Sequence, residues 1–161
     1  MHRVEQLFGH LTARVAADEL ARASGILPAT AWPLFAGMPI ADRRHALDVT
    51  HRLLSGGNDD PELLCAALLH DAAKGTRLRL WHRVSGVLLQ ALAPRLLARL
   101  ASPNPRSAGH PYYLYLYHAD LSAEAALGAG CTERTAAFIT GRQGTADAGL
   151  AATLHDADEA S

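Results

Sequence analysis

The sequence predicts an all-α protein, a helical bundle of six or seven helices. Alanine, leucine and arginine recur at helical spacing along nearly the whole chain, and alternating runs of β-branched residues are missing. Apolar residues make up 49% and charged residues 19% of the 161 positions, a composition typical of packed globular proteins and not of disordered or fibrous ones. This length suits one domain with a single core.

Residues 1–39 are predicted to contain one helix and a linker. A helix over about residues 4–23, ended by Gly25, is predicted by the apolar stripe of Val4, Leu7, Leu11, Val15 and Leu20. A linker rich in proline and glycine follows. Its residues 32–35 are expected to fill part of the core from a short helical turn.

Further helices are predicted between residues 40 and 100. One helix begins after Ile40 and stops at Ser55-Gly56-Gly57, and the next opens at the cap Asp60-Pro61 and runs from Glu62 to about Lys74. A long segment over residues 78–100, bent at Pro94, carries arginines beside its leucines.

The C-terminal part is also predicted to be helical. A helix begins at Pro111, because Leu114 and His118 recur at helical spacing, and a strand over residues 112–117 is the alternative. Thr132 is expected to start another helix, and a final one begins near Ala146 and reaches the end of the chain.

The charge balance bears on the partners of this protein. Lys and Arg number 15 against 16 Asp and Glu, so no general field attracts nucleic acid or anionic lipid. The segment 78–100 resembles a membrane-surface or nucleic-acid helix, but its apolar face is expected to be needed for the core. No apolar run approaches the ~18 residues of a membrane span, and Cys65 and Cys131 form no CxxC motif. We therefore expect a cytoplasmic protein with neither membrane nor nucleic-acid partners.

Four polar residues lie on otherwise apolar helix stripes. His45 has apolar residues four and eight positions after it, and His70 and Asp71 continue two leucine rows of the following helix. Among the acids of the last helix, Asp158 is the one on its leucine stripe. A buried carboxylate beside an imidazole is costly unless a cation pairs with it. The pattern therefore predicts a divalent metal ion held by His45, His70, Asp71 and Asp158.

This donor set indicates both the metal and its chemistry. Imidazole and carboxylate groups without a thiolate suit Mn, Fe, Ni, Zn or Mg. Such an ion lowers the pKa of bound water and polarises a phosphoryl oxygen, as phosphoester hydrolysis requires. Lys74, the chain's single lysine, lies one turn after His70 and is expected to meet the phosphate.

The segments ADRRHALDVTHRLL, LLCAALLHDAAK and LHDAD together resemble the HD domain superfamily of metal-dependent phosphohydrolases, whose pattern is H...HD...D on a helical bundle. The resemblance covers about residues 40–161 and implies that they form the HD core of a single domain, with residues 1–39 as a family-specific helical cap. It implies that His45, His70, Asp71 and Asp158 ligate the metal, that Asp71 also orients the attacking water, and that Lys74 faces the phosphate. A small phosphorylated substrate, a nucleotide in particular, is implied as well.

Some HD proteins hold a second metal through an extra histidine and a later His-His pair. The segment YHADLSAEAAL resembles the surroundings of that histidine, which makes His118 a candidate for a second metal or for substrate. Arg142 and Gln143 stand where the pair is expected, and Arg142 and Arg44 are candidates for phosphate binding. Without the pair, the alternatives are a degenerate HD domain that binds a nucleotide or protein partner without catalysis, or a purely structural module.

Overall fold

The computed structural model describes residues 15–161, and this part of the chain contains nine α-helices, one 3-10 helix and no strand. The all-α prediction is confirmed for these residues, and the alternative strand over 112–117 is wrong because those residues are helical. The predicted six or seven helices become nine because short helices occur at residues 32–36 and 94–100. Residues 4–14 of the predicted first helix lie outside the described part.

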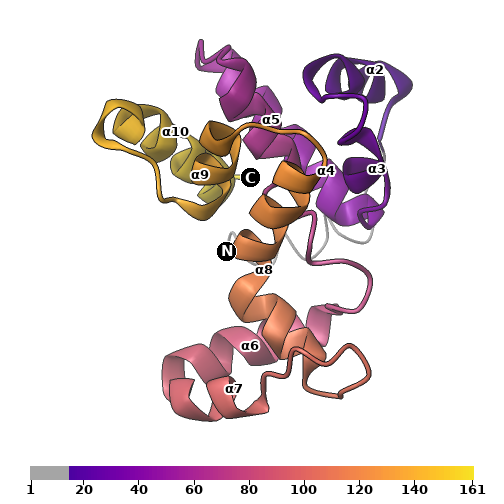
Figure 1. Cartoon of the computed structure of the whole chain (residues 1–161), viewed down its shortest axis with the longest axis vertical. Coiled ribbons are helices and arrows are strands. Elements are labelled where there is room, and N and C mark those ends of the chain that lie inside the picture. The colour runs from indigo at the N-terminus through magenta and orange to yellow at the C-terminus, as the bar shows by residue number, and fades with distance from the viewer. Residues whose placement is uncertain (1–14) are drawn as a thin grey trace.

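The helices are arranged as Figure 1 shows. Their bounds are α2 (Ala17–Ile26), α3 (Trp32–Ala36), α4 (Ile40–Ser55), α5 (Pro61–Leu69), α6 (Leu80–Leu92), α7 (Pro94–Leu100), α8 (His110–Gly128), α9 (Glu133–Thr140), η1 (Thr145–Asp147) and α10 (Ala148–Glu159).

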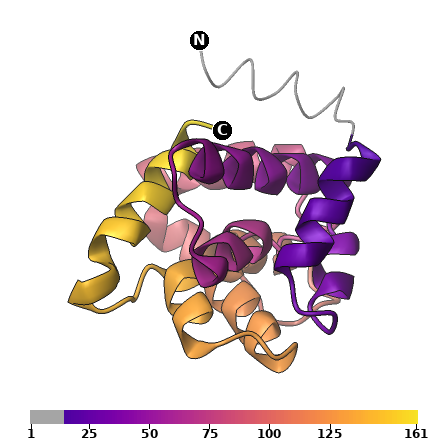
Figure 2. The same cartoon turned by 90° about the horizontal axis from the view of Figure 1, so that it is seen from above.

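Helix α5 lies in the interior of the bundle. Its residues 63–69 are all buried, and it contacts α2, α3, α4, α8, α9 and α10. Figure 2 shows α2 and α10 on opposite sides of the molecule with α5 between them. The predicted start is confirmed: Pro61 occupies the first turn, and the Asp60 carboxylate accepts hydrogen bonds from the amides of Glu62 and Leu63 at 3.0 Å.

Two predicted helix ends differ from the structure. Helix α2 continues through Gly25 to Ile26. Helix α5 ends at Leu69 and not near Lys74, because the chain then tightens: the amide of Lys74 bonds to the Asp71 carbonyl three residues back. His70 and Asp71 therefore project from the C-terminal end of α5 and the turns that follow it, not from a continuous helix stripe.

The segment predicted as one bent helix over 78–100 is two helices. Proline lacks an amide proton and disfavours helical backbone in the residue before it. Accordingly, Ala93 has φ −149° and ψ 61°, which ends α6 and lets Pro94 start α7. Both helices pack on α8, and together with its first turns they form a lobe at the lower end of Figure 1.

The expectation that this segment buries its apolar face is correct only for a few residues, among them Leu78 and Leu97. Within residues 15–161, the main core takes no side chain from α6 or α7. Eight of their large apolar side chains are exposed, among them Leu92 at 82%. Helix α6 is joined to α4 by an ion pair with a buried acid, in which the Arg83 Nη2 lies 2.7 and 2.8 Å from the carboxylate oxygens of Asp42. Among the described residues, no helix has the length and apolar character to cross a membrane.

Candidate metal centre

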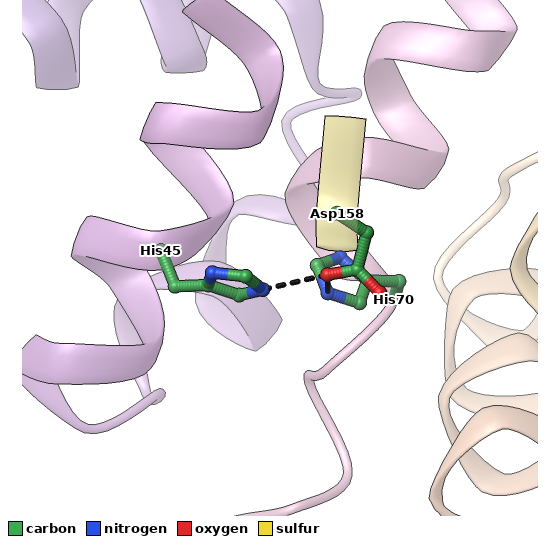
Figure 3. A group of neighbouring side chains, drawn as sticks. All are labelled: His45, His70 and Asp158. Carbon is green, nitrogen blue, oxygen red and sulfur yellow. Dashed lines mark hydrogen bonds and ion pairs between the residues drawn. The ribbon is translucent and has the colours of Figure 1, made fainter. Parts of the chain in front are cut away.

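Three of the predicted ligands converge at one point. His45 comes from α4, His70 follows α5 directly, and Asp158 lies in the last turn of α10. One ligand atom from each lies within 4.8 Å of the other two. The Nε2 of His45 is 2.7 Å from Asp158 Oδ1, and the Nε2 of His70 is 3.4 Å from the same oxygen. Figure 3 shows both imidazoles directed at this carboxylate.

The position of Asp158 depends on how α10 is fixed against the rest of the bundle. Helix α10 contacts both α4 and α5, and its Leu154 and Ala157 are buried in the core. The Arg52 side chain of α4 donates to the Ala160 carbonyl at 2.7 Å. The last turn of α10, which carries Asp158, is therefore held against α4.

His70 has one ring nitrogen hydrogen-bonded to the backbone and the other directed at two carboxylates. Its Nδ1 lies 2.9 Å from the Ala67 carbonyl, which orients the ring. Its Nε2 is buried and makes no hydrogen bond. Burial disfavours a charged imidazole, but the carboxylates of Asp71 and Asp158 outweigh it and raise the pKa of His70 to about 9. This point in the molecule thus favours a positive charge.

Asp71 lies next to the three converging residues but outside their cluster. It is 1% exposed, and its Oδ2 is 3.6 Å from His70 Nε2 and 2.5 Å from Lys74 Nζ. Its Oδ1 is buried without a hydrogen bond. Desolvation alone would raise the pKa of Asp71, but the charges of His70 and Lys74 hold it well below its usual range. The carboxylate is therefore ionised and has one oxygen unsatisfied.

His118 approaches the same carboxylate from α8. Its Nδ1 is 3.0 Å from the Tyr115 carbonyl, and its Nε2 is 3.8 Å from Asp71 Oδ1. Burial and the nearby charge of Lys74 lower the pKa of His118. A neutral imidazole whose Nδ1 proton is donated to a carbonyl presents an acceptor at Nε2. His118 is thus oriented to bind a cation or to accept a proton.

The three cations predicted to bind phosphate are all in ion pairs. Lys74 pairs with Asp71 as described. Arg44 lies 2.7 Å from Glu19 and 2.8 Å from Asp48. Arg142 is 70% exposed and lies 2.7 Å from Asp120. The structure therefore places Lys74 against the candidate ligand Asp71, whereas Arg44 and Arg142 pair with acids outside the candidate centre.

A hollow of about 500 Å³ opens beside His70, His118 and Asp158. Most of its wall consists of small or apolar residues of α8, α9 and α10, including Ala119, Ala151 and Leu154. Among the described residues that line it, none is Lys or Arg. The ligand candidates therefore face a concave surface large enough for a small molecule.

Three polar residues that line this hollow are not among the predicted site residues: Thr140, Gln143 and His155. Gln143 lines it with its Oε1 buried and without a hydrogen bond; it was noted in the sequence only as the replacement for a histidine. His155 lines it as well. The signal for His155 was its position three residues before Asp158, which places both on one helix face.

The centre offers imidazole nitrogens and carboxylate oxygens and includes no thiolate, a donor set suited to a hard or borderline divalent ion. No family model, curated protein or solved structure matches this chain. Its function is therefore inferred from the donors, the hollow and the sequence motifs.

Proposed function

We propose that this chain is a metal-dependent phosphohydrolase of the HD type, acting on a phosphomonoester or phosphodiester, with a nucleotide as the substrate class. The observation that carries the proposal is the convergence of His45, His70 and Asp158. Residues 45 and 158 are 113 positions apart in the sequence, yet their side chains are 2.7 Å apart. The order and types of these residues are those of the H...HD...D motif.

The residues present fit a divalent ion. His70 Nε2 and Asp71 Oδ1 are both buried without a hydrogen bond, and each such unsatisfied atom costs about 1–3 kcal/mol. A cation held by His45, His70, Asp71 and Asp158 would satisfy both atoms at once. The donors are compatible with Mn, Fe, Ni, Zn or Mg.

A bound divalent ion would supply Lewis acidity, lowering the pKa of water and polarising a phosphoryl oxygen. The Asp71 carboxylate would orient the attacking water. His118, whose Nε2 is oriented to accept a proton or a cation, would accept a proton from a substrate in the hollow or hold a second ion.

Lys74 has a different assignment from the one that its sequence position suggested. Its Nζ lies 2.5 Å from Asp71 Oδ2, so we assign it to positioning that carboxylate and not to contacting the phosphate. Because the described lining of the hollow has no Lys or Arg, the charge of a bound phosphate would be balanced mainly by the metal.

Metal analysis combined with a phosphoesterase screen tests this proposal. We expect purified protein to hold a divalent metal in stoichiometric amount and to hydrolyse mononucleotides, cyclic nucleotides or a generic phosphodiester. The variant His45→Ala should lose metal affinity and turnover by about 100-fold or more. His51→Ala is the matched control, because it removes an exposed histidine from the same helix α4. A His45→Ala protein that keeps both metal and activity would contradict the proposal.

A second candidate function, binding of a nucleotide without catalysis, is favoured by one observation. His45 pairs directly with Asp158, Lys74 pairs with Asp71, and His70 Nε2 lies 3.4 Å from Asp158. All four candidate ligand side chains therefore already have partners within the protein. Metal-free protein that binds a nucleotide saturably and leaves it intact would identify this function.

A further inference from the structure

We propose that the exposed apolar face of α6 and α7 binds the surface of an anionic lipid bilayer. The face, called here the α6–α7 face, consists of eight side chains: Leu80, Trp81, Val84, Val87, Leu88, Leu92, Leu96 and Leu100. Each is between 41% and 82% exposed. They are eight of the twelve large apolar residues that are exposed in residues 15–161, so they are concentrated in one lobe of the molecule (Figure 1).

Helix α6 has two faces with different surroundings. His82 and Gly86 are buried, and Gly86 lies so close to α8 that an added Cβ would be 2.9 Å from the Tyr115 ring. The six exposed apolar side chains of α6 fall within a sector of roughly 140°, at about 100° per residue. No charged residue falls inside that sector. This second face is therefore an apolar surface whose large side chains are between 41% and 82% exposed.

The size of the α6–α7 face sets it apart from ordinary surface. At on the order of 100 Å² each, these eight side chains of two contacting helices expose roughly 800 Å² in total, whereas a soluble monomer rarely exposes an apolar patch of more than a few hundred Å². Such a patch marks an interaction site with a protein or a membrane.

The charge of the surrounding segment selects between these partners. Residues 72–119 contain no Asp or Glu and seven basic residues: Lys74, Arg77, Arg79, Arg83, Arg95, Arg99 and Arg106. The rest of the chain holds the other eight basic residues and all 16 acidic ones. Five of the seven are exposed and form no ion pair within the described residues: Arg77, Arg79, Arg95, Arg99 and Arg106.

This combination suits an anionic lipid surface. Interfacial helices place Trp and Leu in the boundary between headgroups and acyl chains, while Arg side chains extend to lipid phosphates. Trp81 is 58% exposed, and Leu92 is 82% exposed beside the junction of α6 and α7. A second copy of the chain fits less well, because two lobes of the same positive charge would face each other.

A membrane partner differs from the sequence-based expectation of none. That expectation rested on net charge −1 and on burial of the apolar face. The face is exposed, and the near-neutral total conceals a basic lobe.

Vesicle binding by the full chain tests the proposal. We expect the protein to sediment with vesicles of phosphatidylcholine mixed with phosphatidylglycerol, and much less with phosphatidylcholine alone. Binding should shift tryptophan emission to shorter wavelength. Trp81→Phe should abolish the shift, because the remaining Trp32 packs against Phe35 in the core.

Matched variants separate the apolar contribution from the electrostatic one. Leu88→Ser with Leu92→Ser should weaken binding at least tenfold, whereas Leu54→Ser with Leu127→Ser, exposed leucines of α4 and α8, should leave it unchanged. Arg95→Gln with Arg99→Gln should weaken binding about 25-fold, about fivefold for each charge.

Three results would overturn the inference. The first is no sedimentation with anionic vesicles at low salt. The second is binding that the Leu88 and Leu92 changes leave intact, which would mean adsorption by charge alone. The third is a lipid-free dimer that those same changes dissociate, which would assign the face to a second copy. None of these results depends on metal or phosphatase activity.

Discussion

At the scale of single residues, Asp71 carries the strongest constraint in the candidate centre. Its carboxylate is 1% exposed, and its oxygens face His70, His118 and Lys74. Lys74 is the cation in closest contact, at 2.5 Å. The lysine thus neutralises a buried charge that a metal would also neutralise.

The variant Lys74→Met tests this compensation. Removing one partner of a buried ion pair leaves an uncompensated charge, so we expect the metal-free protein to lose about 3 kcal/mol of stability. Added Mn²⁺ or Zn²⁺ should raise the Tm of the variant more than that of the wild type, because the ion replaces the missing positive charge. Thermal unfolding with chelator and with metal measures the difference. Equal metal-induced shifts in both proteins would show that Lys74 and the ion do not share Asp71.

The two cysteines are a second case in which the environment of single residues sets reactivity. Cys65 and Cys131 are free and buried, with their Sγ atoms 3.6 Å apart. Desolvation, together with the neighbouring Cys131 thiol, raises the pKa of Cys65 to about 12. The thiolate is the reactive form, so this thiol is protected in the folded protein.

Thiol labelling measures that protection. We expect the native protein to react with a thiol reagent such as Ellman's reagent far more slowly than the protein unfolded in guanidinium, in which both thiols should react. Rapid labelling of the native protein at neutral pH would mean that α5 and the turn between α8 and α9 separate readily.

At the scale of helices, the junction between α7 and α8 allows very little space. Gly109 precedes α8, and a Cβ built on it would lie 1.9 Å from the Leu100 carbonyl oxygen at the end of α7. Because the obstacle is backbone, no side-chain rotation relieves it. Glycine at this position is what allows α7 to return closely against α8.

The variant Gly109→Ala should therefore destabilise the protein by about 2–3 kcal/mol, the range of strong overpacking. Gly25→Ala is the matched control: Gly25 lies within α2, nothing surrounds its Cβ position within 4 Å, and alanine should stabilise it by about 0.5–1 kcal/mol. Chemical denaturation of both variants measures these changes. Equal stability of the two variants would contradict the close contact between Gly109 and the Leu100 carbonyl.

At the scale of the whole molecule, Arg134 connects three separate parts of the chain. Its guanidinium lies 2.8 Å from Asp60 and 2.6 Å from Glu62 at the start of α5, and 2.9 Å from Asp147 before α10. Desolvation would raise the pKa of Asp60, but hydrogen bonds from the Leu63 amide and Arg134 outweigh it and lower that pKa. Hydrogen bonds from Thr132 and Arg134 lower the pKa of Glu62.

These shifts predict how stability depends on pH. A carboxylate whose pKa is lower in the folded state stabilises the fold fully above its unfolded pKa, and this stabilisation is lost as the pH falls through the folded value. The unfolded values are 3.8 for Asp60 and 4.5 for Glu62, so the wild-type Tm should fall below about pH 5. In Arg134→Met the fall should be shallower. Thermal unfolding of both proteins between pH 7 and pH 3 tests this prediction. Parallel curves of Tm against pH for the wild type and Arg134→Met would exclude a role for this network.

Much of the fold follows from local signals in the sequence. The cap at Asp60-Pro61, the Thr132 cap, whose side chain accepts from the Thr135 amide, and the helical periodicity after Pro111 each act within a few residues. Local signals of this kind also selected His45, His70 and Asp158, because a polar side chain on an apolar stripe stands out in any helix.

The tertiary structure decided what local signals do not contain. Whether the apolar face of α6 meets a core depends on where Pro94 turns the chain and on how many faces α8 can cover. Whether Lys74 meets a phosphate or Asp71 depends on the tightening of the chain after Leu69. The sequence by itself determined the helices and the candidate ligands, since both depend on neighbours in the chain. The exposed basic lobe, the ion pairs of Arg44 and Arg142 and the hollow beside His70 depend on contacts between distant segments, so only the folded molecule could decide them.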